Sequence, residues 1–349
     1  MTDRLNDRSH SAKNIFKLLS ERVVGQDQAQ RDLATLLAMH LQWSLKPDPH
    51  TAPNALIIGP TGVGKTHAIR TASEILNIPL AIVDATRLTS HGLDSSLDAV
   101  LVELISAARR VIAGEHGASS SELDEQNLAR RGVVFIDEFD KLATRERSSH
   151  ERNELIQRRL LQFVDGMTVV LNPSPENGNQ EILFDTQGLL FIAAGAFTDL
   201  LDDLGQRPLR TMGQMKEHNR VIPLDIERYG FMQELVARLP VLIEFSNLSE
   251  DNLVEILLRD VIDPSKFYVQ YISSLGSELV FTPESRRWAA SSAVSLEIGA
   301  RGLHQVLFPI LAQLSQNIEE EQVPPKVVKL DMNMIMRLKR QIEAKRNAR

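Results

Sequence analysis

Residues 59–66 read GPTGVGKT and follow a short apolar run at residues 55–58. The segment from His67 to Leu76 has the character of a helix. A strand, a glycine-containing loop and a helix in this order are what the phosphate-binding pattern G-x-x-x-x-G-K-[ST] requires. Its glycines let successive backbone N–H groups point at phosphates, and the helix N-terminus adds a positive dipole. An accidental turn would give this match in roughly one chain in a hundred.

The side chains of this loop predict how a nucleoside triphosphate binds. Lys65 is expected to reach the β- and γ-phosphates, and the Thr66 hydroxyl to ligate Mg²⁺. We therefore expect ATP and Mg²⁺ as cofactors. The residues expected to contact the nucleotide here are Thr61, Gly62, Val63, Gly64, Lys65, Thr66 and His67.

A second motif, VVFIDE at residues 133–138, is an apolar strand that ends in two carboxylates. Asp137 can hold Mg²⁺ through its water shell, and Glu138 can orient or deprotonate the attacking water. Two acids after a strand are most often a solvated strand end. Downstream of a phosphate-binding loop they favour ATP hydrolysis, with Lys65, Asp137 and Glu138 as catalytic residues.

Composition limits the classes of function. The 349 residues are 43% hydrophobic, carry a net charge of −7 and include no cysteine. The charge argues against a nucleic-acid binder, and the absence of cysteine excludes disulfides and Cys-ligated zinc. The basic residues between Lys339 and Arg349 are interpreted as a solvated helix face. Without a secretory pattern or a membrane-spanning apolar run, we expect a cytoplasmic protein without membrane contact.

Apolar runs that alternate with helical segments predict an α/β fold with a doubly wound parallel sheet. We expect a disordered N-terminus over residues 1–13, a large α/β domain over 14–247 and a small helical domain over 248–349. Within the large domain, the polar stretch 114–131 is expected to be a surface loop. In the small domain, Ser249 and Thr282 are expected to cap helices.

Taken in order, several segments resemble the AAA+ ATPases of the ClpX/HslU family, the ATP-binding subunits of Clp-type proteases. The resemblance runs from about residue 14 to residue 320. It is carried by residues 23–29, 59–66, 135–142, 191–197, 237–240, 248–250 and 299–303. It implies an AAA+ P-loop core followed by a small helical lid domain, and ATP hydrolysis coupled to protein remodelling.

The resemblance also implies roles for residues outside the two motifs. Val23 and Val24 match the segment that packs on adenine. Arg238 matches the arginine finger that reaches the neighbouring subunit's γ-phosphate, and Arg301 the sensor-2 arginine that faces its own subunit's nucleotide. A guanidinium stabilises charge that spreads over the γ-phosphoryl oxygens, although a surface ion pair is the alternative for either arginine. A finger between subunits implies a ring, and the family implies a homohexamer.

The chain departs from the family pattern in its substrate and partner loops. At the first pore loop, residues 91–95, Leu93 replaces an aromatic residue and Asp94 adds a charge beside it. Residues 173–180, matching a basic pore-entrance loop, contain no Lys, Arg or His, and residues 204–225 lack the Ile/Leu-Gly-Phe tripeptide for peptidase docking. With no cysteine in the sequence, a cysteine-ligated zinc domain is not expected, and Ala194 stands at the polar sensor-1 position.

Four functions remain open. The leading hypothesis is a ring ATPase that remodels or unfolds protein substrates, with a ClpP-type peptidase partner in doubt. The alternatives are a divergent unfoldase subunit of a Clp-type protease and a nucleic-acid motor, which the net acidity disfavours. The fourth is a non-catalytic ATP-binding switch, which Ala194 makes conceivable.

Overall fold

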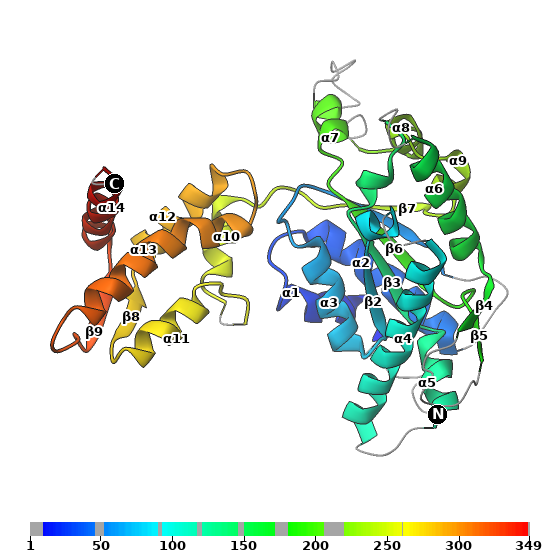
Figure 1. Ribbon diagram of the computed structural model, residues 1–349, viewed down its shortest axis with the longest axis horizontal. Coiled ribbons are helices and arrows are strands. Elements are labelled where there is room, and N and C mark those ends of the chain that lie inside the picture. The colour runs from blue at the N-terminus through cyan, green and yellow to red at the C-terminus, as the bar shows by residue number, and fades with distance from the viewer. Residues whose placement is uncertain are drawn as a thin grey trace. The chain divides into compact units, whose positions relative to one another are not determined.

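The computed structural model describes residues 10–45, 52–89, 93–116, 121–145, 150–171, 181–205, 220–259 and 261–347. The chain divides into two compact units (Figure 1). Unit 1 comprises Met1–Gly59 and Lys65–Phe245, and unit 2 comprises Pro60–Gly64 and Ser246–Arg349. The main division therefore falls between Phe245 and Ser246, two residues before the boundary that was expected after residue 247. Among the described residues, no helix combines the length and apolar character needed to cross a bilayer.

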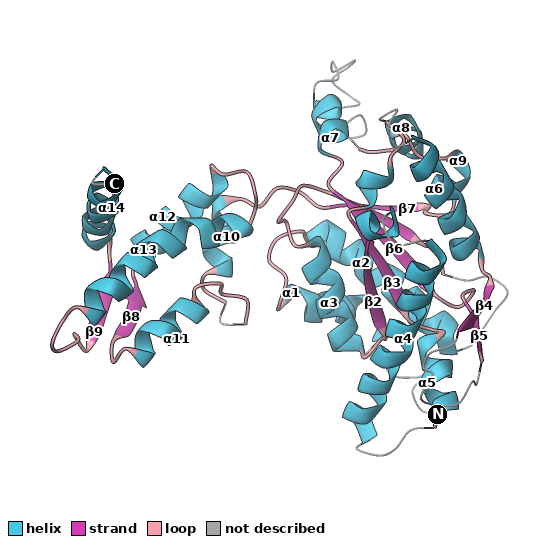
Figure 2. Ribbon diagram, viewed as in Figure 1, coloured by secondary structure: helices cyan, strands magenta, loops and turns pink. Residues whose placement is uncertain are grey.

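Unit 1 is built on a five-stranded parallel sheet in the order β2-β3-β6-β1-β7 (Figure 2). Its strands are β1 (Ala55–Ile58), β2 (Leu80–Asp84), β3 (Val133–Asp137), β6 (Leu190–Gly195) and β7 (Val241–Glu244). Every residue of β1 and β6 is buried, which explains why these strands are continuous apolar runs. The predicted α/β fold with a parallel sheet is confirmed.

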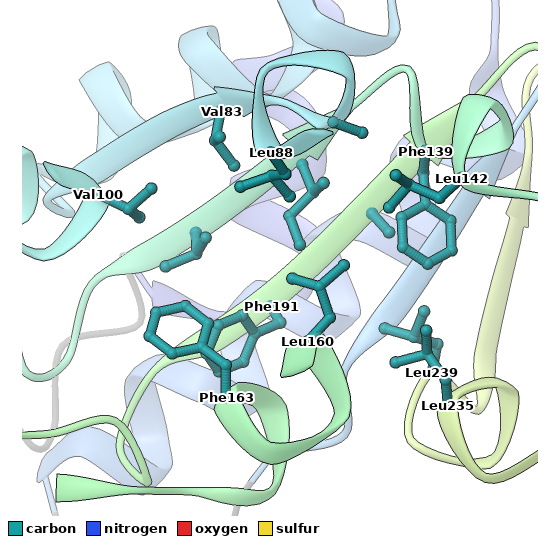
Figure 3. Close-up of a cluster of buried hydrophobic side chains, with 14 of the residues drawn as sticks. Val83, Leu88, Val100, Phe139, Leu142, Leu160, Phe163, Phe191, Leu235 and Leu239 are labelled. Atoms are coloured by element: carbon teal, nitrogen blue, oxygen red, sulfur yellow. The ribbon is translucent and has the colours of Figure 1, made fainter. Parts of the chain in front are cut away.

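Helices cover both faces of this sheet. One face packs on α4, α6 and α9, where the edge-to-face rings of Phe163 and Phe191 lie 5.3 Å apart (Figure 3). On the other face, Leu37 of α2 and Ile69 of α3 line a small apolar cavity with Ile192 of β6. Unit 1 contains α1 (Ala12–Ser20), α2 (Asp27–Leu45), α3 (Lys65–Leu76), α4 (Leu93–His116), α5 (Glu122–Ala129), α6 (His150–Asp165), α7 (Thr198–Gly205), α8 (Pro223–Tyr229), α9 (Gln233–Ala237), the 3₁₀ turns η3 (Ala85–Thr89) and η4 (Phe139–Leu142), and the antiparallel pair β4 (Thr168–Leu171) and β5 (Ile182–Asp185).

Two expectations for unit 1 were wrong. The stretch expected to be a loop contains α5, whose N-cap Ser121 accepts a hydrogen bond from the backbone of Asp124. Glu125 of this helix is buried and pairs with Arg109 of α4 at 2.9 Å, so a tertiary ion pair stabilises a segment too polar to be recognised by apolar spacing. The N-terminal boundary was also misplaced, because Ser11 caps α1 and the helix begins at Ala12.

Unit 2 is not wholly helical, in contrast to the expectation. It contains α10 (Glu250–Ile256), α11 (Lys266–Ser274), α12 (Pro283–Val294), α13 (Arg301–Glu319) and α14 (Met332–Asn347). The strands β8 (Glu278–Phe281) and β9 (Val327–Leu330) form a parallel pair in which exposed and buried residues alternate. This period of two distinguishes them from helix, but each spans only four residues. The caps at Ser249 and Thr282 are confirmed.

Candidate functional site

The glycine loop leaves the carboxyl end of β1, which lies between β6 and β7 in the sheet. Gly59 has a φ of +158°, and a Cβ built on it would lie 2.4 Å from the carbonyl oxygen of Phe245. Only glycine therefore fits where β1 ends. Lys65 opens α3, and its Nζ donates a hydrogen bond to the Gly59 carbonyl at 2.6 Å, so the ammonium lies over the start of the loop.

Thr66 and Asp137 meet across the site. The Thr66 hydroxyl donates a hydrogen bond to Oδ2 of Asp137 at 2.6 Å, although 71 residues separate them in the chain. A hydroxyl and a carboxylate are hard oxygen donors, and Mg²⁺ is commonly bound by one or two such groups while it keeps several waters. The pair therefore fits the expected magnesium site. The described residues contain no group of three or more His, Cys, Asp or Glu that could enclose a metal ion.

Glu138 has an unusual backbone conformation at the end of β3. Its φ is +55°, in the left-handed region that non-glycine residues rarely adopt, and its N–H donates to Oδ1 of Asp137 at 2.9 Å. The conformation turns the chain into η4, and the Glu138 side chain is exposed. Backbone strain of this kind concentrates at functional sites. The carboxylate is thus open to water, on the residue that follows Asp137 of the Thr66–Asp137 pair.

A buried carboxylate that the sequence analysis gave no role connects this motif to β6. Asp140 is 7% exposed, and its Oδ1 accepts a hydrogen bond from the backbone N–H of Ala196 at 3.2 Å. A Cβ on Gly195 would lie 2.7 Å from the same oxygen, so glycine is needed there. Ala194, the expected sensor-1 position, is fully buried in β6. The signal for Asp140 was its place in the segment 135–142, which carries the family resemblance.

Arg238 follows α9 on the surface of unit 1. Its Nε lies 2.5 Å from Oδ1 of Asp165, and the two side chains are 57% and 36% exposed. Its carbonyl accepts a hydrogen bond from the Asn54 amide at 3.2 Å. The alternative of a surface ion pair is therefore realised within this subunit. Arg301 is exposed at the first position of α13 in unit 2.

The segment expected to contact adenine is fixed by a buried amide that the sequence analysis missed. Val23 and Val24 are 4% and 5% exposed. Nε2 of the buried Gln30 donates to the carbonyl oxygens of Val23, at 3.3 Å, and Gly25. Arg22 precedes this segment, and its carbonyl oxygen lies 3.0 Å from Nε2 of His67, which joins the segment to the first turn of α3.

The expectations for the pore and docking loops fall largely outside the described residues. This holds for His91 and Gly92, for the side chains of residues 93–95, and for residues 172–180 and 206–219.

Known proteins share this sequence pattern over most of the chain. Residues 50–242, more than half of the chain, match the family model described as AAA domain (Cdc48 subfamily). The "ATP-dependent Clp protease ATP-binding subunit ClpX 2" of Wolinella succinogenes is 31% identical over 337 residues, which cover 90% of this chain and 81% of the relative. The ClpX subunits of Porphyromonas gingivalis and Bacteroides fragilis are each 29% identical, over 85% and 91% of this chain and 75% and 79% of their own.

Proposed function

This chain belongs to the ClpX family of AAA+ ATPases, and from that premise we propose that it hydrolyses ATP within a ring of subunits to remodel protein substrates. The observation that carries the proposal is the Thr66–Asp137 hydrogen bond at 2.6 Å, with the exposed Glu138 beside it. It joins the phosphate-binding loop and the acidic strand end into one site of the kind that ATP hydrolysis requires.

Each residue then has a defined task in hydrolysis. Lys65 would leave the Gly59 carbonyl for the β- and γ-phosphates, and Thr66 and Asp137 would hold Mg²⁺, Asp137 through water. The metal would supply positive charge that offsets the negative charge of the phosphate oxygens. Glu138 orients the attacking water and accepts its proton. Arg238 reaches the γ-phosphate bound by the neighbouring subunit, whereas Arg301 acts on the nucleotide of its own subunit.

The binding of adenine and the assembly state complete the proposal. Val23 and Val24 supply the apolar contact for the base, and Gln30 fixes their backbone. A finger that acts between subunits needs a closed ring, for which we propose a homohexamer. Arg238 is held at the surface of unit 1 by an exposed ion pair. Such pairs contribute only about 0.2–1 kcal/mol and exchange readily, so the Arg238 side chain can be released toward a neighbouring subunit.

The pore and docking loops set the proposed substrate range. A pore that grips any extended chain benefits from a large flat ring, and Leu93 provides neither the area nor the flat face. Asp94 beside it adds a charge, and burying a charge against an apolar substrate chain costs free energy. We therefore propose weak processive unfolding and no docking on a ClpP-type peptidase, with remodelling directed at particular partner complexes.

The second candidate is an unfoldase subunit that works with a peptidase. It is favoured by the names of the relatives, which are ATP-binding subunits of an ATP-dependent Clp protease. One experiment separates the two. A tagged fluorescent barrel is incubated with the protein and ATP, with and without a ClpP-type peptidase. Persistent fluorescence supports the partner-specific remodeller. Rapid loss of fluorescence shows that Leu93 grips well, and degradation that depends on the peptidase establishes the second candidate.

A further inference from the structure

Helix α6 carries a fully buried amide, Gln157, which is hydrogen-bonded to backbone on two separate segments. Its Nε2 donates to the carbonyl oxygen of Leu142 at 2.8 Å and to that of Gly230 at 3.1 Å. Its Oε1 accepts a hydrogen bond from the N–H of Met232 at 2.8 Å. Both ends of the amide are therefore satisfied, which removes the usual penalty for burying a polar group.

The two segments lead to the two halves of the proposed ATPase chemistry. Leu142 ends η4, which begins immediately after Glu138. Met232 is the N-cap of α9, and Arg238 follows that helix directly. Gln157 is thus a bridge between the backbone behind the water-orienting carboxylate and the backbone that carries the arginine finger.

Contacts around Gly230 strengthen this bridge. Its carbonyl oxygen also accepts hydrogen bonds from the N–H and the hydroxyl of Thr144, at 3.0 Å and 2.9 Å. Gly230 has a φ of +119°, and a Cβ on it would lie 2.8 Å from the Thr144 nitrogen, so a side chain would separate the segments. Beside these bonds, the rings of Phe139 and Phe231 stack with centroids 4.7 Å apart.

Helix α6 holds the far end of α9 as well. Asp165, its last residue, pairs with the guanidinium of Arg238. Gln157 therefore fixes where α9 begins, and Asp165 holds the side chain that follows its end. The buried bond resists exchange, whereas the exposed pair can be released when a phosphate competes for Arg238.

We propose that Gln157 is a positioning residue, which ties the segment behind Glu138 to the start of α9 and so sets the reach of Arg238 toward the neighbouring subunit. The inference rests on the proposed role of Arg238. Its consequence is that a change in the Glu138 segment of one subunit moves the finger that this subunit offers to the next. Hydrolysis at successive sites is then coupled through α6.

The test is a double-mutant cycle on assembled protein. Gln157→Met keeps a similar length but removes all three hydrogen bonds, and Arg238→Ala removes the finger. We expect each single variant to lower kcat about tenfold or more, with the affinity for ATP unchanged, because the binding residues are untouched. The double variant should be no slower than Arg238→Ala within about twofold, since both changes remove one function.

Asn153→Leu is the matched control. Asn153 is an amide on the same helix, 4% exposed, but its two hydrogen bonds go only to Lys141 and Ala143, on the first segment. Any loss it causes should multiply with that of Arg238→Ala. If the Gln157→Met loss multiplies in the same way, the residue is merely structural and the inference is wrong. If Arg238→Ala alone leaves kcat unchanged, the proposed finger is wrong and this inference falls with it.

A milder variant keeps the test decisive if Gln157→Met does not fold. Thr144→Val removes only the hydroxyl bond to the Gly230 carbonyl and preserves the N–H bond. We expect a smaller fall in kcat that again disappears in the Arg238→Ala background. A loss that persists unchanged in that background would overturn the inference.

Discussion

Arg238 and Asp165 form an ion pair at 2.5 Å between the residue that follows α9 and the last residue of α6. Both side chains keep contact with water, at 57% and 36% exposure. Solvent screens such a pair, so it holds the guanidinium without burying it. A side chain that acts on a neighbouring subunit needs this combination, because it must be ordered in one subunit and still be releasable.

Asp165→Asn should therefore release Arg238. If the pair competes with the γ-phosphate, its removal should raise kcat/KM for ATP by at most about fivefold, from a pair worth up to about 1 kcal/mol. The gain should vanish in high salt, where the pair is already screened. The matched control is Glu103→Gln, which breaks another exposed pair, that with Arg110 of α4 at 2.6 Å. A fall in activity in Asp165→Asn would show that the pair supports the finger.

Glu138→Gln should separate ATP binding from hydrolysis. The amide cannot accept the proton of the attacking water, so we expect a loss of about 10²–10⁴-fold in turnover, as is typical for general bases. Nucleotide affinity should persist, whereas Lys65→Ala should weaken binding itself. Equilibrium binding of a fluorescent ATP analogue and steady-state phosphate release measure the two effects. Unchanged turnover would refute the role of Glu138.

Mixed rings test whether Arg238 acts between subunits. Arg238→Ala and Lys65→Ala proteins should each be nearly inactive alone. Mixed before assembly, they should regain part of the activity at interfaces that pair an intact Arg238 with an intact Lys65. The ATPase rate across mixing ratios gives the readout. A fully active monomer in the presence of ATP would exclude the ring.

The altered pore loop predicts a restoring substitution. Leu93→Tyr combined with Asp94→Val supplies a flat ring and removes the charge, so it should raise non-specific unfolding of a tagged fluorescent barrel. ATP hydrolysis without substrate should change little. If unfolding does not increase, residues 91–95 do not line the pore.

His40 should make stability depend on pH. Burial lowers the pKa of His40 from its ordinary value of 6.5, while Nε2 lies 2.9 Å from the carbonyl of Arg131. As the pH falls below the ordinary value of 6.5, His40 takes up a proton in the unfolded chain but not in the native protein. The free energy of unfolding therefore keeps its full value above this pH and declines below it. His40→Gln should flatten that decline. Urea midpoints at about pH 5 and about pH 7 measure it, and equal slopes in both proteins would rule out His40.

The phosphate-binding loop, the strands β1, β2, β3 and β6 of the main sheet and the caps at Ser249 and Thr282 follow from the sequence because their signals are local. Continuous apolar runs predict buried strands, and a cap acts within one turn of its helix. The two motifs, the phosphate-binding loop with Thr66 and the later apolar strand that ends at Asp137, were also sufficient to expect both residues in one site. What placed them at 2.6 Å from each other was the pairing of β1 and β3 with β6 in one sheet.

Only the tertiary structure decided which polar side chains are buried and what they bind. Gln157 reads as one more polar residue of a helix, yet its partners Leu142 and Gly230 lie 15 and 73 residues away. The Glu125–Arg109 pair, which supports α5, likewise depends on the packing of two helices. The identity of a buried amide or carboxylate says that a partner is needed. Which partner is available is set by chain segments that folding alone brings together.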